Sequence, residues 1–89
     1  MADVSATTLD GNALAGALEA VFGEEMTTAT GTCASCGASG EVARFVVYMR
    51  GPGAVARCAV CTAVLMVLVT RREVTCVDLR GLAALERPG

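Results

Sequence analysis

The stretch from Cys33 to Cys61 decides the fold of this chain: it begins Cys33-Ala34-Ser35-Cys36-Gly37 and ends Cys58-Ala59-Val60-Cys61-Thr62. Positions 37 to 57, which are 21 residues, separate Cys36 from Cys58. Two Cys-x-x-Cys pairs at about this separation are typical of a tetrahedral zinc site in which each pair lies on a tight turn. The segment between the pairs is long enough for two strands and a turn. We therefore expect the pairs to meet around one ion.

The ligands of this Zn²⁺ site are expected to be Cys33, Cys36, Cys58 and Cys61. Four thiolates fill a tetrahedral coordination shell, and a closed site of this kind is structural rather than catalytic. Gly37 suits the first turn because glycine adopts a positive φ without steric cost, whereas Thr62 predicts that the second turn differs. The alternatives are iron in the same cage, a pair of disulfides, or a dithiol redox motif. Zinc is the interpretation that the doubled spacing favours.

The length and composition predict a single domain that gains from a metal. The chain has 89 residues, of which 54% are hydrophobic, mostly Ala, Val and Leu. A chain this small buries only a modest fraction of its surface, so a metal ion is useful for stability. The longest apolar run, Ala63 to Val69, is too short to cross a bilayer, which takes about 20 residues in a helix. Met1 to Ser5 show no export signal, so we expect a cytoplasmic protein whose cysteines stay reduced.

The charge is small but unevenly distributed. The net charge is −2, and the chain has no histidine. Five acidic residues and no basic residue precede Cys33, and seven arginines and four acidic residues follow it. The net negative charge argues against a global attraction to nucleic acid. The arginines are explained either by a GC-rich coding bias or by a surface for anionic groups, since arginine offers bidentate geometry.

An amphipathic helix is predicted over residues 9–23, after a loosely held segment at 1–8. Asp10 is a good N-cap, and Gly23 is placed where a glycine ends a helix. The apolar stripe consists of Leu14, Ala17, Leu18, Val21 and Phe22. A helix this short must pack against another element to be stable, so we expect it to cover a sheet.

Residues 26–80 are expected to form the metal-bearing ribbon and a second hairpin. Met26 to Thr30 suit a short strand, and Glu41 to Arg50 alternate as one long strand. The core face of that strand would carry Ala43, Phe45, Val47 and Met49, and the other face Val42, Arg44, Val46, Tyr48 and Arg50. Gly51-Pro52-Gly53 predicts a turn, from which Ala54 to Arg57 return to the second cysteine pair.

The second hairpin is predicted from Val64 to Thr70 and Glu73 to Leu79, with a turn near Arg71-Arg72. Residues 64–69 are apolar on both faces, which indicates burial from two sides. The metal-bearing sheet would cover one side, and the helix or a second copy of the chain the other. Cys76 is interpreted as a small buried hydrophobic residue. Leu82 to Glu86 are expected to form one helical turn.

This organisation resembles the zinc-ribbon class, in which two Cys-x-x-Cys turns on paired hairpins share one ion. The chain also looks like a short bacterial zinc-ribbon family that has only a domain-of-unknown-function label. The residues that carry this likeness are Leu9-Asp10-Gly11-Asn12-Ala13-Leu14-Ala15-Gly16, Val21-Phe22-Gly23, Met26-Thr27, the two cysteine turns, and Asp78-Leu79-Arg80-Gly81. The likeness implies zinc binding through the four cysteines and supplies no activity. The expected fold is thus a small α+β metal-stabilised domain of zinc-ribbon-like antiparallel β-hairpins with an N-terminal helix.

The sequence argues against an enzyme, since it has no histidine base, no nucleophile with an evident partner and no phosphate-binding loop. No small-molecule substrate or membrane partner is indicated. Our first hypothesis is a zinc-binding module for protein–protein interaction or a homodimer, through strand 64–69 or helix 9–23. The second is a nucleic-acid- or ribonucleoprotein-associated ribbon. Its candidate contacts are Arg44, Tyr48, Arg50, Arg57, Arg71 and Arg72.

Overall fold

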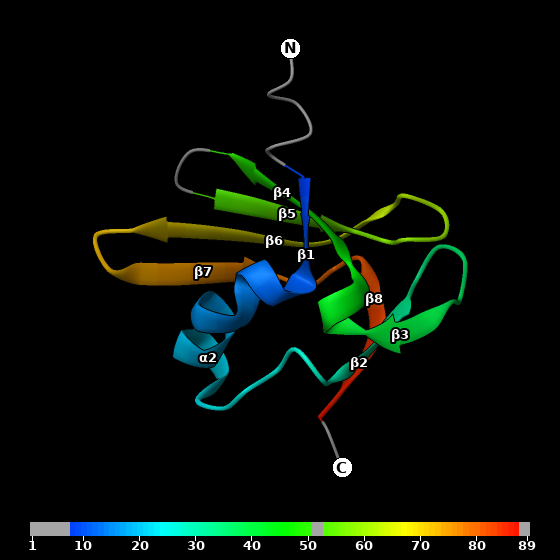
Figure 1. Ribbon diagram of the computed structural model, residues 1–89, viewed down its shortest axis with the longest axis horizontal. Helices are drawn as coiled ribbons and strands as arrows, with labels where there is room; N and C mark the ends of the chain where they lie inside the picture. The colour runs from blue at the N-terminus through cyan, green and yellow to red at the C-terminus, as the bar shows by residue number, and fades with distance from the viewer. Residues whose placement is uncertain (1–7, 51–52, 88–89) are drawn as a thin grey trace.

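The structure is a computed structural model that describes residues 8–50 and 53–87. It is a small, mostly antiparallel β domain with one short α-helix near the N-terminus (Figure 1). A five-stranded sheet has the order β1-β4-β5-β6-β7, and a three-stranded sheet has the order β3-β2-β8. The elements are β1 (Thr8–Asp10), the 3-10 helix η1 (Gly11–Leu14), α2 (Ala15–Phe22), β2 (Thr30–Cys33), β3 (Ser39–Glu41), the 3-10 helix η2 (Val42–Arg44), β4 (Val46–Arg50), β5 (Gly53–Arg57), β6 (Val64–Arg71), β7 (Val74–Asp78) and β8 (Leu82–Glu86).

The predicted helix is present, with a tighter first turn than expected. The Asp10 carboxylate accepts a hydrogen bond from the Asn12 backbone N–H at 3.0 Å, which caps η1, and α2 continues the same segment. Gly23 ends α2 in the left-handed conformation, with φ 77°. Leu14 and Leu18 are buried in the core. None of the helices in the described part of the chain is long and apolar enough to cross a bilayer. Thr8 and Leu9 form part of β1, which corrects the prediction of a loose segment up to residue 8 and of a helix from residue 9; residues 1–7 lie outside the described residues.

The predicted strand from Met26 to Thr30 is wrong, because Glu25 holds these residues in a turn. The Glu25 carboxylate accepts hydrogen bonds from the Thr27 N–H and from the hydroxyl groups of Thr27 and Thr28. Side-chain acceptors of this kind compete with strand pairing for nearby backbone donors. These hydrogen bonds lower the pKa of Glu25, first through the Thr27 hydroxyl. Strand β2 begins only at Thr30.

The single long strand predicted from Glu41 to Arg50 is also wrong, since η2 divides it. The Val42 N–H donates to the Ala29 carbonyl and the Ala43 N–H to the Thr27 carbonyl, both at 2.9 Å, so the chain turns here. Val42 is therefore fully buried, although the alternation placed it on the other face. This break lets β3 belong to the three-stranded sheet and β4 to the five-stranded sheet.

The outcome for the remaining residues of that strand is mixed. Phe45 and Val47 are buried as predicted, but Met49, which was assigned to the core, is 41% exposed. The β4–β5 hairpin forms as expected, and β5 covers Gly53–Arg57. The predicted turn at Gly51 and Pro52 lies outside the described residues.

The C-terminal segment is a strand rather than the predicted helical turn. β8 pairs antiparallel with β2, with Gly31 opposite Leu85 and Thr32 opposite Ala84. Leu82 and Leu85 pack against the core, and this packing favours an extended conformation. The β6–β7 hairpin is confirmed, with Arg72 and Glu73 at its tip.

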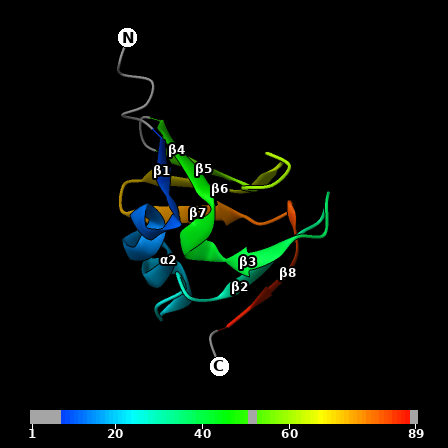
Figure 2. The same ribbon diagram turned by 45° about the vertical axis from the view of Figure 1, so that its right-hand side comes forward.

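The core lies between the two sheets and α2, on one face of the five-stranded sheet. Cross-strand partners share a face, and Val47, Ala56 and Met66 form a buried row of this kind. The register shifts between Ala56 and Arg57, so that both Leu65 and Met66 are buried. Leu14 and Leu18 belong to the same core, and Figures 1 and 2 show α2 and the three-stranded sheet below the five-stranded sheet in both views. The helix and the three-stranded sheet therefore lie on one side of β6, and the predicted metal-bearing hairpin, β4 and β5, is in the same sheet as β6 rather than packed over it.

This arrangement corrects two predictions about the second hairpin. Leu65, Met66 and Leu68 are buried, but Val67 and Val69 are only half-buried, so β6 is covered on one side within the described chain. Cys76 is exposed rather than buried. Its register partner is Val69, which places Cys76 on the face turned away from the core.

Candidate metal centre

The four predicted ligands come from two turns that belong to different sheets. Cys33 is the last residue of β2 and Cys36 lies in the connection from β2 to β3, whereas Cys58 and Cys61 lie in the connection from β5 to β6. Figure 1 shows both connections on the right-hand side of the molecule. All four Sγ atoms lie within 4.8 Å of one another. An ion held by these sulfurs would therefore join the two sheets directly.

The two turns have the same hydrogen-bond pattern. The N–H groups of Ser35 and Cys36 point at the Cys33 sulfur, with N–S distances of 3.3 and 3.4 Å. In the second turn, the N–H groups of Val60 and Cys61 point at the Cys58 sulfur, at 3.3 and 3.5 Å. Each turn thus supplies two backbone donors to its first cysteine, which stabilises a thiolate there.

The backbone closes both turns in the same way, which corrects the expectation that they differ. The Gly37 N–H donates to the Cys33 carbonyl at 2.9 Å, and the Thr62 N–H donates to the Cys58 carbonyl at 3.0 Å. Both residues are left-handed, with φ 79° at Gly37 and 66° at Thr62. The Thr62 carbonyl accepts a hydrogen bond from Nη1 of Arg57 at 2.9 Å, which secures the second turn.

The thiols differ in acidity because their donors differ. The N–H groups of Cys61 and Val60 lower the pKa of Cys58 to about 7. The N–H of Cys36 is the first cause of a lowered pKa at Cys33. At Cys36 the Ala38 N–H lowers the pKa, but desolvation and the neighbouring thiols of Cys61, Cys58 and Cys33 together raise it to about 11. The backbone N–H groups of the two turns thus favour the thiolate form of Cys33 and Cys58, the first cysteine of each pair.

The sulfur geometry fits a tetrahedral metal ion. Zn–S bonds of about 2.3 Å imply a tetrahedron with edges of about 3.8 Å. The Cys33–Cys61 and Cys36–Cys58 sulfur pairs are each 3.7 Å apart. All five cysteines of the chain lie in the described part, and each of them is free rather than in a disulfide. Four thiolates suit zinc and iron alike, so the donor set fits a metal ion without choosing between them.

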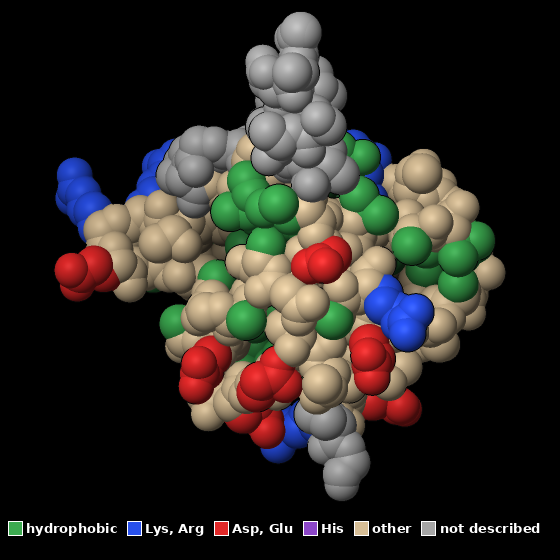
Figure 3. Space-filling view, viewed as in Figure 1, with side chains coloured by type: hydrophobic (Ala, Val, Ile, Leu, Met, Phe, Trp, Pro, Cys, Tyr) green, Lys and Arg blue, Asp and Glu red, His purple; other side chains and the backbone are tan. Residues whose placement is uncertain are grey.

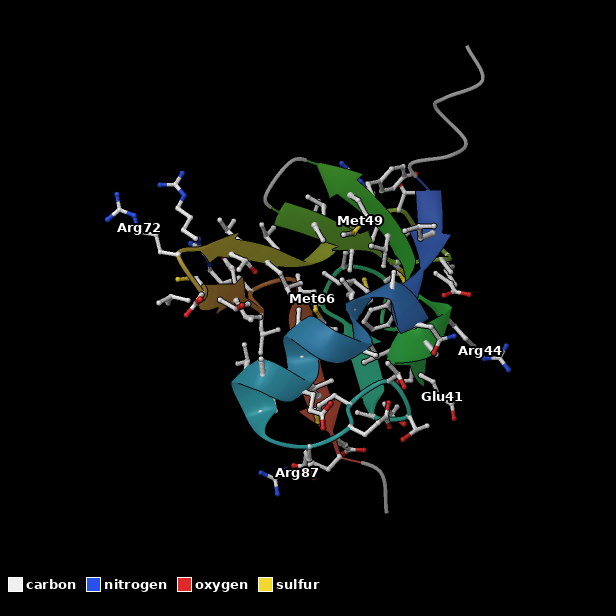
Figure 4. The ribbon with its side chains drawn as sticks, turned by 60° about the vertical axis from the view of Figure 1, so that its left-hand side comes forward. Glu41, Arg44, Met49, Met66, Arg72 and Arg87 are labelled. Carbon is white, nitrogen blue, oxygen red and sulfur yellow. The ribbon has the colours of Figure 1, made fainter. Side chains whose placement is uncertain are left out.

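The candidate nucleic-acid contacts are dispersed. Arg44 and Arg72 lie at opposite ends of the molecule and point away from it (Figure 4). Tyr48 and Arg57 are neighbours, with the Arg57 guanidinium 5.8 Å from the centre of the Tyr48 ring. Arg71 is exposed at the end of β6, and the side chain of Arg50 lies outside the described part of the structure. Among the five of these residues whose side chains the structure describes, Tyr48 and Arg57 are brought together.

Charge on the α2 side of the molecule is mainly acidic. Figure 3 shows Asp and Glu side chains gathered over the lower half of this face, with arginines at its periphery. Glu24, which follows the C-terminal end of α2, pairs with Arg87 at 2.9 Å. This face offers no continuous basic surface.

Sequence reasoning missed the parts of the site that act through the backbone. The donors at Ser35 and Val60 have no side-chain signal, and only the Cys-x-x-Cys spacing points to them. The sequence predicts Arg57 as a nucleic-acid contact, yet its guanidinium donates a hydrogen bond to the Thr62 carbonyl. Its position immediately before Cys58 is the only sequence clue to that role.

No curated protein and no solved structure matches this chain. The sequence profile of one family covers residues 5–89, nearly the whole chain. With its four clustered cysteines and its extent of match, the chain belongs to the family described as "Family of unknown function (DUF6510)".

Proposed function

We propose that this protein is a non-catalytic zinc-binding module that mediates protein–protein interaction or self-association. Cys33, Cys36, Cys58 and Cys61 hold one structural Zn²⁺ ion, and the module works in the cytoplasm, where free thiols persist. The observation that carries the proposal is the cluster of four sulfurs within 4.8 Å, contributed by two turns of the same conformation. Zinc is preferred to iron because it needs no redox partner and suits a purely structural role.

The position of the cluster supports a structural role for the ion. One turn connects two strands of the three-stranded sheet and the other connects two strands of the five-stranded sheet, so an ion held by both turns would join the sheets. A structural zinc ion in a small module contributes about 10–16 kcal/mol of apparent binding free energy near neutral pH. Small domains have a net stability of about 5–15 kcal/mol. The metal is therefore expected to decide whether this chain is folded.

A binding role is preferred to catalysis on chemical grounds. Four thiolates leave the ion no vacant coordination position for water or substrate. The chain also lacks histidine, the usual base near neutral pH. Exposed hydrophobic side chains on the five-stranded sheet include Val64 and Val74, and they support a role in interaction, since exposed apolar surface can mark interaction sites.

Native mass spectrometry of protein expressed in zinc-supplemented medium tests the metal. We expect one zinc ion per chain, lost together with folded structure after treatment with a strong chelator. Circular dichroism before and after chelation gives the second readout. A chain that binds no metal, or whose melting temperature is unchanged by complete chelation, would contradict the structural role.

A second candidate function is nucleic-acid binding, which the contact between Tyr48 and Arg57 favours. Aromatic and guanidinium groups both stack on bases, and stacking is tolerant of sequence. Binding of a fluorescent single-stranded oligonucleotide at low and moderate salt tests this candidate, because phosphate contacts weaken as salt rises. No binding at low ionic strength would remove it.

A further inference from the structure

The four clustered sulfurs include two close pairs, and each of these pairs joins the two turns. The Sγ atoms of Cys36 and Cys58 are 3.7 Å apart, and so are those of Cys33 and Cys61, within a cluster in which all four sulfurs lie within 4.8 Å. A disulfide bond is about 2.05 Å long, so each sulfur would move by less than about 1 Å to form one. The sulfurs of both cross-turn pairs therefore lie close to bonding distance.

The two members of each cross-turn pair differ in exposure. Cys36 is exposed and Cys61 is half-buried, whereas their partners Cys58 and Cys33 are both buried. Each pair thus combines an accessible cysteine from one turn with a buried cysteine from the other. This arrangement suits reversible thiol oxidation, because an oxidant reaches the accessible sulfur and a neighbouring cysteine then resolves the product as a disulfide.

A disulfide within a single turn is the competing product. Such a bond would close a loop with only two residues between its cysteines, whereas the cross-turn bonds join cysteines that are 22 and 28 positions apart. Closing a longer loop removes more conformational freedom from the unfolded chain and therefore stabilises the fold more. The cross-turn bonds would also connect the two sheets, as an ion held by both turns would. The cross-turn product is thus the one that preserves the fold.

We infer that the metal centre is an oxidation switch, in which hydrogen peroxide converts the four ligand thiolates into two cross-turn disulfides and releases the ion. The disulfides are Cys36–Cys58 and Cys33–Cys61. This inference rests on the proposed structural zinc and deepens it by naming a regulation of the same site. Two peroxide molecules take up the four electrons that the four thiolates lose. With four protons from solvent, the products are two disulfides, one free Zn²⁺ ion and four water molecules.

The first disulfide begins at Cys36, the exposed cysteine of the cluster. Each ligand is a thiolate while the metal is bound. The Cys36 sulfur attacks one peroxide oxygen, so that an S–O bond forms, the O–O bond breaks, and the released hydroxide takes a proton to become water. The Cys58 sulfur then attacks the sulfur of this sulfenic acid: the S–S bond forms, the S–O bond breaks, and the second hydroxide leaves as water. Cys61 and Cys33 repeat both steps with a second peroxide molecule.

Peptide mapping tests the pairing, because trypsin separates the two turns: cleavage after Arg44 and Arg57 leaves each cysteine pair on its own peptide. The zinc-loaded protein is treated with two equivalents of hydrogen peroxide, and its remaining thiols are alkylated before digestion. We expect a zinc indicator to report nearly complete release of the ion and mass spectrometry to find the two peptides joined. Fragmentation of the joined peptides should then assign Cys36 to Cys58.

The order of the steps has its own test. At less than one equivalent of peroxide, a reagent that traps sulfenic acids should label Cys36 before any other cysteine of the cluster. A label that reaches Cys58 first would overturn this order.

Cys76→Ser is the matched control, since Cys76 is exposed, lies outside the cluster and falls on a third tryptic peptide. Zinc release and the joined peptides should be the same in this variant as in the unmodified chain. A variant that keeps its zinc under peroxide would show that Cys76 takes part in the oxidation, which would overturn a switch made of the four ligands alone.

Thermal denaturation followed by circular dichroism measures whether the disulfides replace the ion. We expect the oxidised, zinc-free chain to keep a cooperative transition and the reduced, zinc-free chain to lose it. Reduction with dithiothreitol in the presence of zinc should restore the loaded protein. An oxidised chain without a cooperative transition would show that the disulfides do not preserve the fold.

The remaining outcomes separate this inference from the proposed function. Two unjoined peptides, each with a disulfide inside its own turn, would overturn the cross-turn pairing. Zinc that stays bound at two equivalents of peroxide, or oxidation of the thiols to sulfinic acid, would overturn the switch and leave the structural zinc intact. A chain that takes up no zinc before any oxidant is added contradicts the proposed function, and the switch is overturned with it.

Discussion

Gly37 and Thr62 occupy the same place in the two cysteine turns, each one residue after the second cysteine of its pair. Both have a left-handed backbone, with φ 79° and 66°, and both donate to the carbonyl of the first cysteine of the pair. Glycine adopts this conformation freely, but for a β-branched residue it is unusual and costly. The two turns therefore have the same backbone geometry, but the backbone is more strained at Thr62 than at Gly37.

The separate substitutions Thr62→Gly and Gly37→Thr should change the free energy of unfolding in opposite directions. Thr62→Gly should stabilise the fold by about 1 kcal/mol, since relief of left-handed strain exceeds the greater flexibility of glycine in the unfolded chain. Gly37→Thr should destabilise it by about 1–2 kcal/mol for the same reason. Chemical denaturation of the zinc-loaded proteins measures both. If Thr62→Gly proved clearly destabilising, the lost hydrogen bond from the Thr62 hydroxyl to the Cys61 carbonyl and the flexibility of glycine in the unfolded chain would outweigh the strain.

Removal of one ligand sulfur should abolish both the metal site and the cooperative fold. Cys58→Ser removes a thiolate that two N–H groups stabilise, and the remaining three sulfurs cannot close the tetrahedron. We expect loss of stoichiometric zinc and loss of a sharp thermal transition, because the metal contributes about as much free energy as the whole fold. Cys76→Ser is the control: this thiol is exposed and outside the cluster, so zinc content and melting temperature should not change. A folded, zinc-bound Cys58→Ser would show that the site tolerates three sulfurs.

The spacing of the cysteines was sufficient to predict which residues cluster, because a Cys-x-x-Cys turn is a local structure. The same holds for the helix, whose cap at Asp10 and end at Gly23 are signalled by single residues. The cysteine spacing did not, however, predict to which sheet each turn belongs. That the turns belong to different sheets follows from the break at η2, where Val42 and Ala43 bond to Ala29 and Thr27 rather than to a neighbouring strand.

The alternation of apolar and polar residues gave a wrong prediction at η2 for a physical reason. Residues 41–50 read as one strand because Val42, Val46 and Val47 favour strands individually, but long-range hydrogen bonds overrode that preference at Val42. The C-terminal segment failed similarly: Leu82 to Glu86 have the composition of a helix, and pairing with β2 made them a strand. In both places, tertiary contacts that no local window contains decided the conformation.

Gly81 should be intolerant of any side chain because two backbone segments meet there. A Cβ atom at Gly81 would lie 1.9 Å from the Val64 carbonyl oxygen and 2.6 Å from the Leu65 Cα atom. Both contacts are with backbone, so Gly81→Ala must displace β6 or the start of β8, and we expect a loss of at least about 3 kcal/mol, as for severe overpacking. Gly16→Ala is the control: its Cβ would meet nothing within 4 Å on α2, so a gain of about 0.5–1 kcal/mol is expected. Thermal denaturation of both variants decides, and a stable Gly81→Ala would contradict this close approach.

Metal binding should weaken as the pH falls, with a proton release that itself depends on pH. Each ligand must be a thiolate, so binding displaces every proton that the metal-free site carries. The pKa of Cys58 is lowered to about 7, chiefly by the Cys61 and Val60 N–H groups, whereas that of Cys36 is raised to about 11. At pH 8, Cys58 is already mostly ionised and Cys36 still carries its proton; at pH 6, both carry one.

The metal lowers all of these pKa values further, so its stabilisation is fully present at high pH and is lost as pH falls through the holo-state values. Isothermal titration calorimetry with zinc in buffers of different ionisation enthalpy should therefore show more protons released at pH 6 than at pH 8. Cys76→Ser, which keeps all four clustered cysteines, should show the same dependence on pH as the unmodified chain. An equal release at both pH values would mean that the backbone N–H groups do not hold Cys58 as the readily ionised thiol.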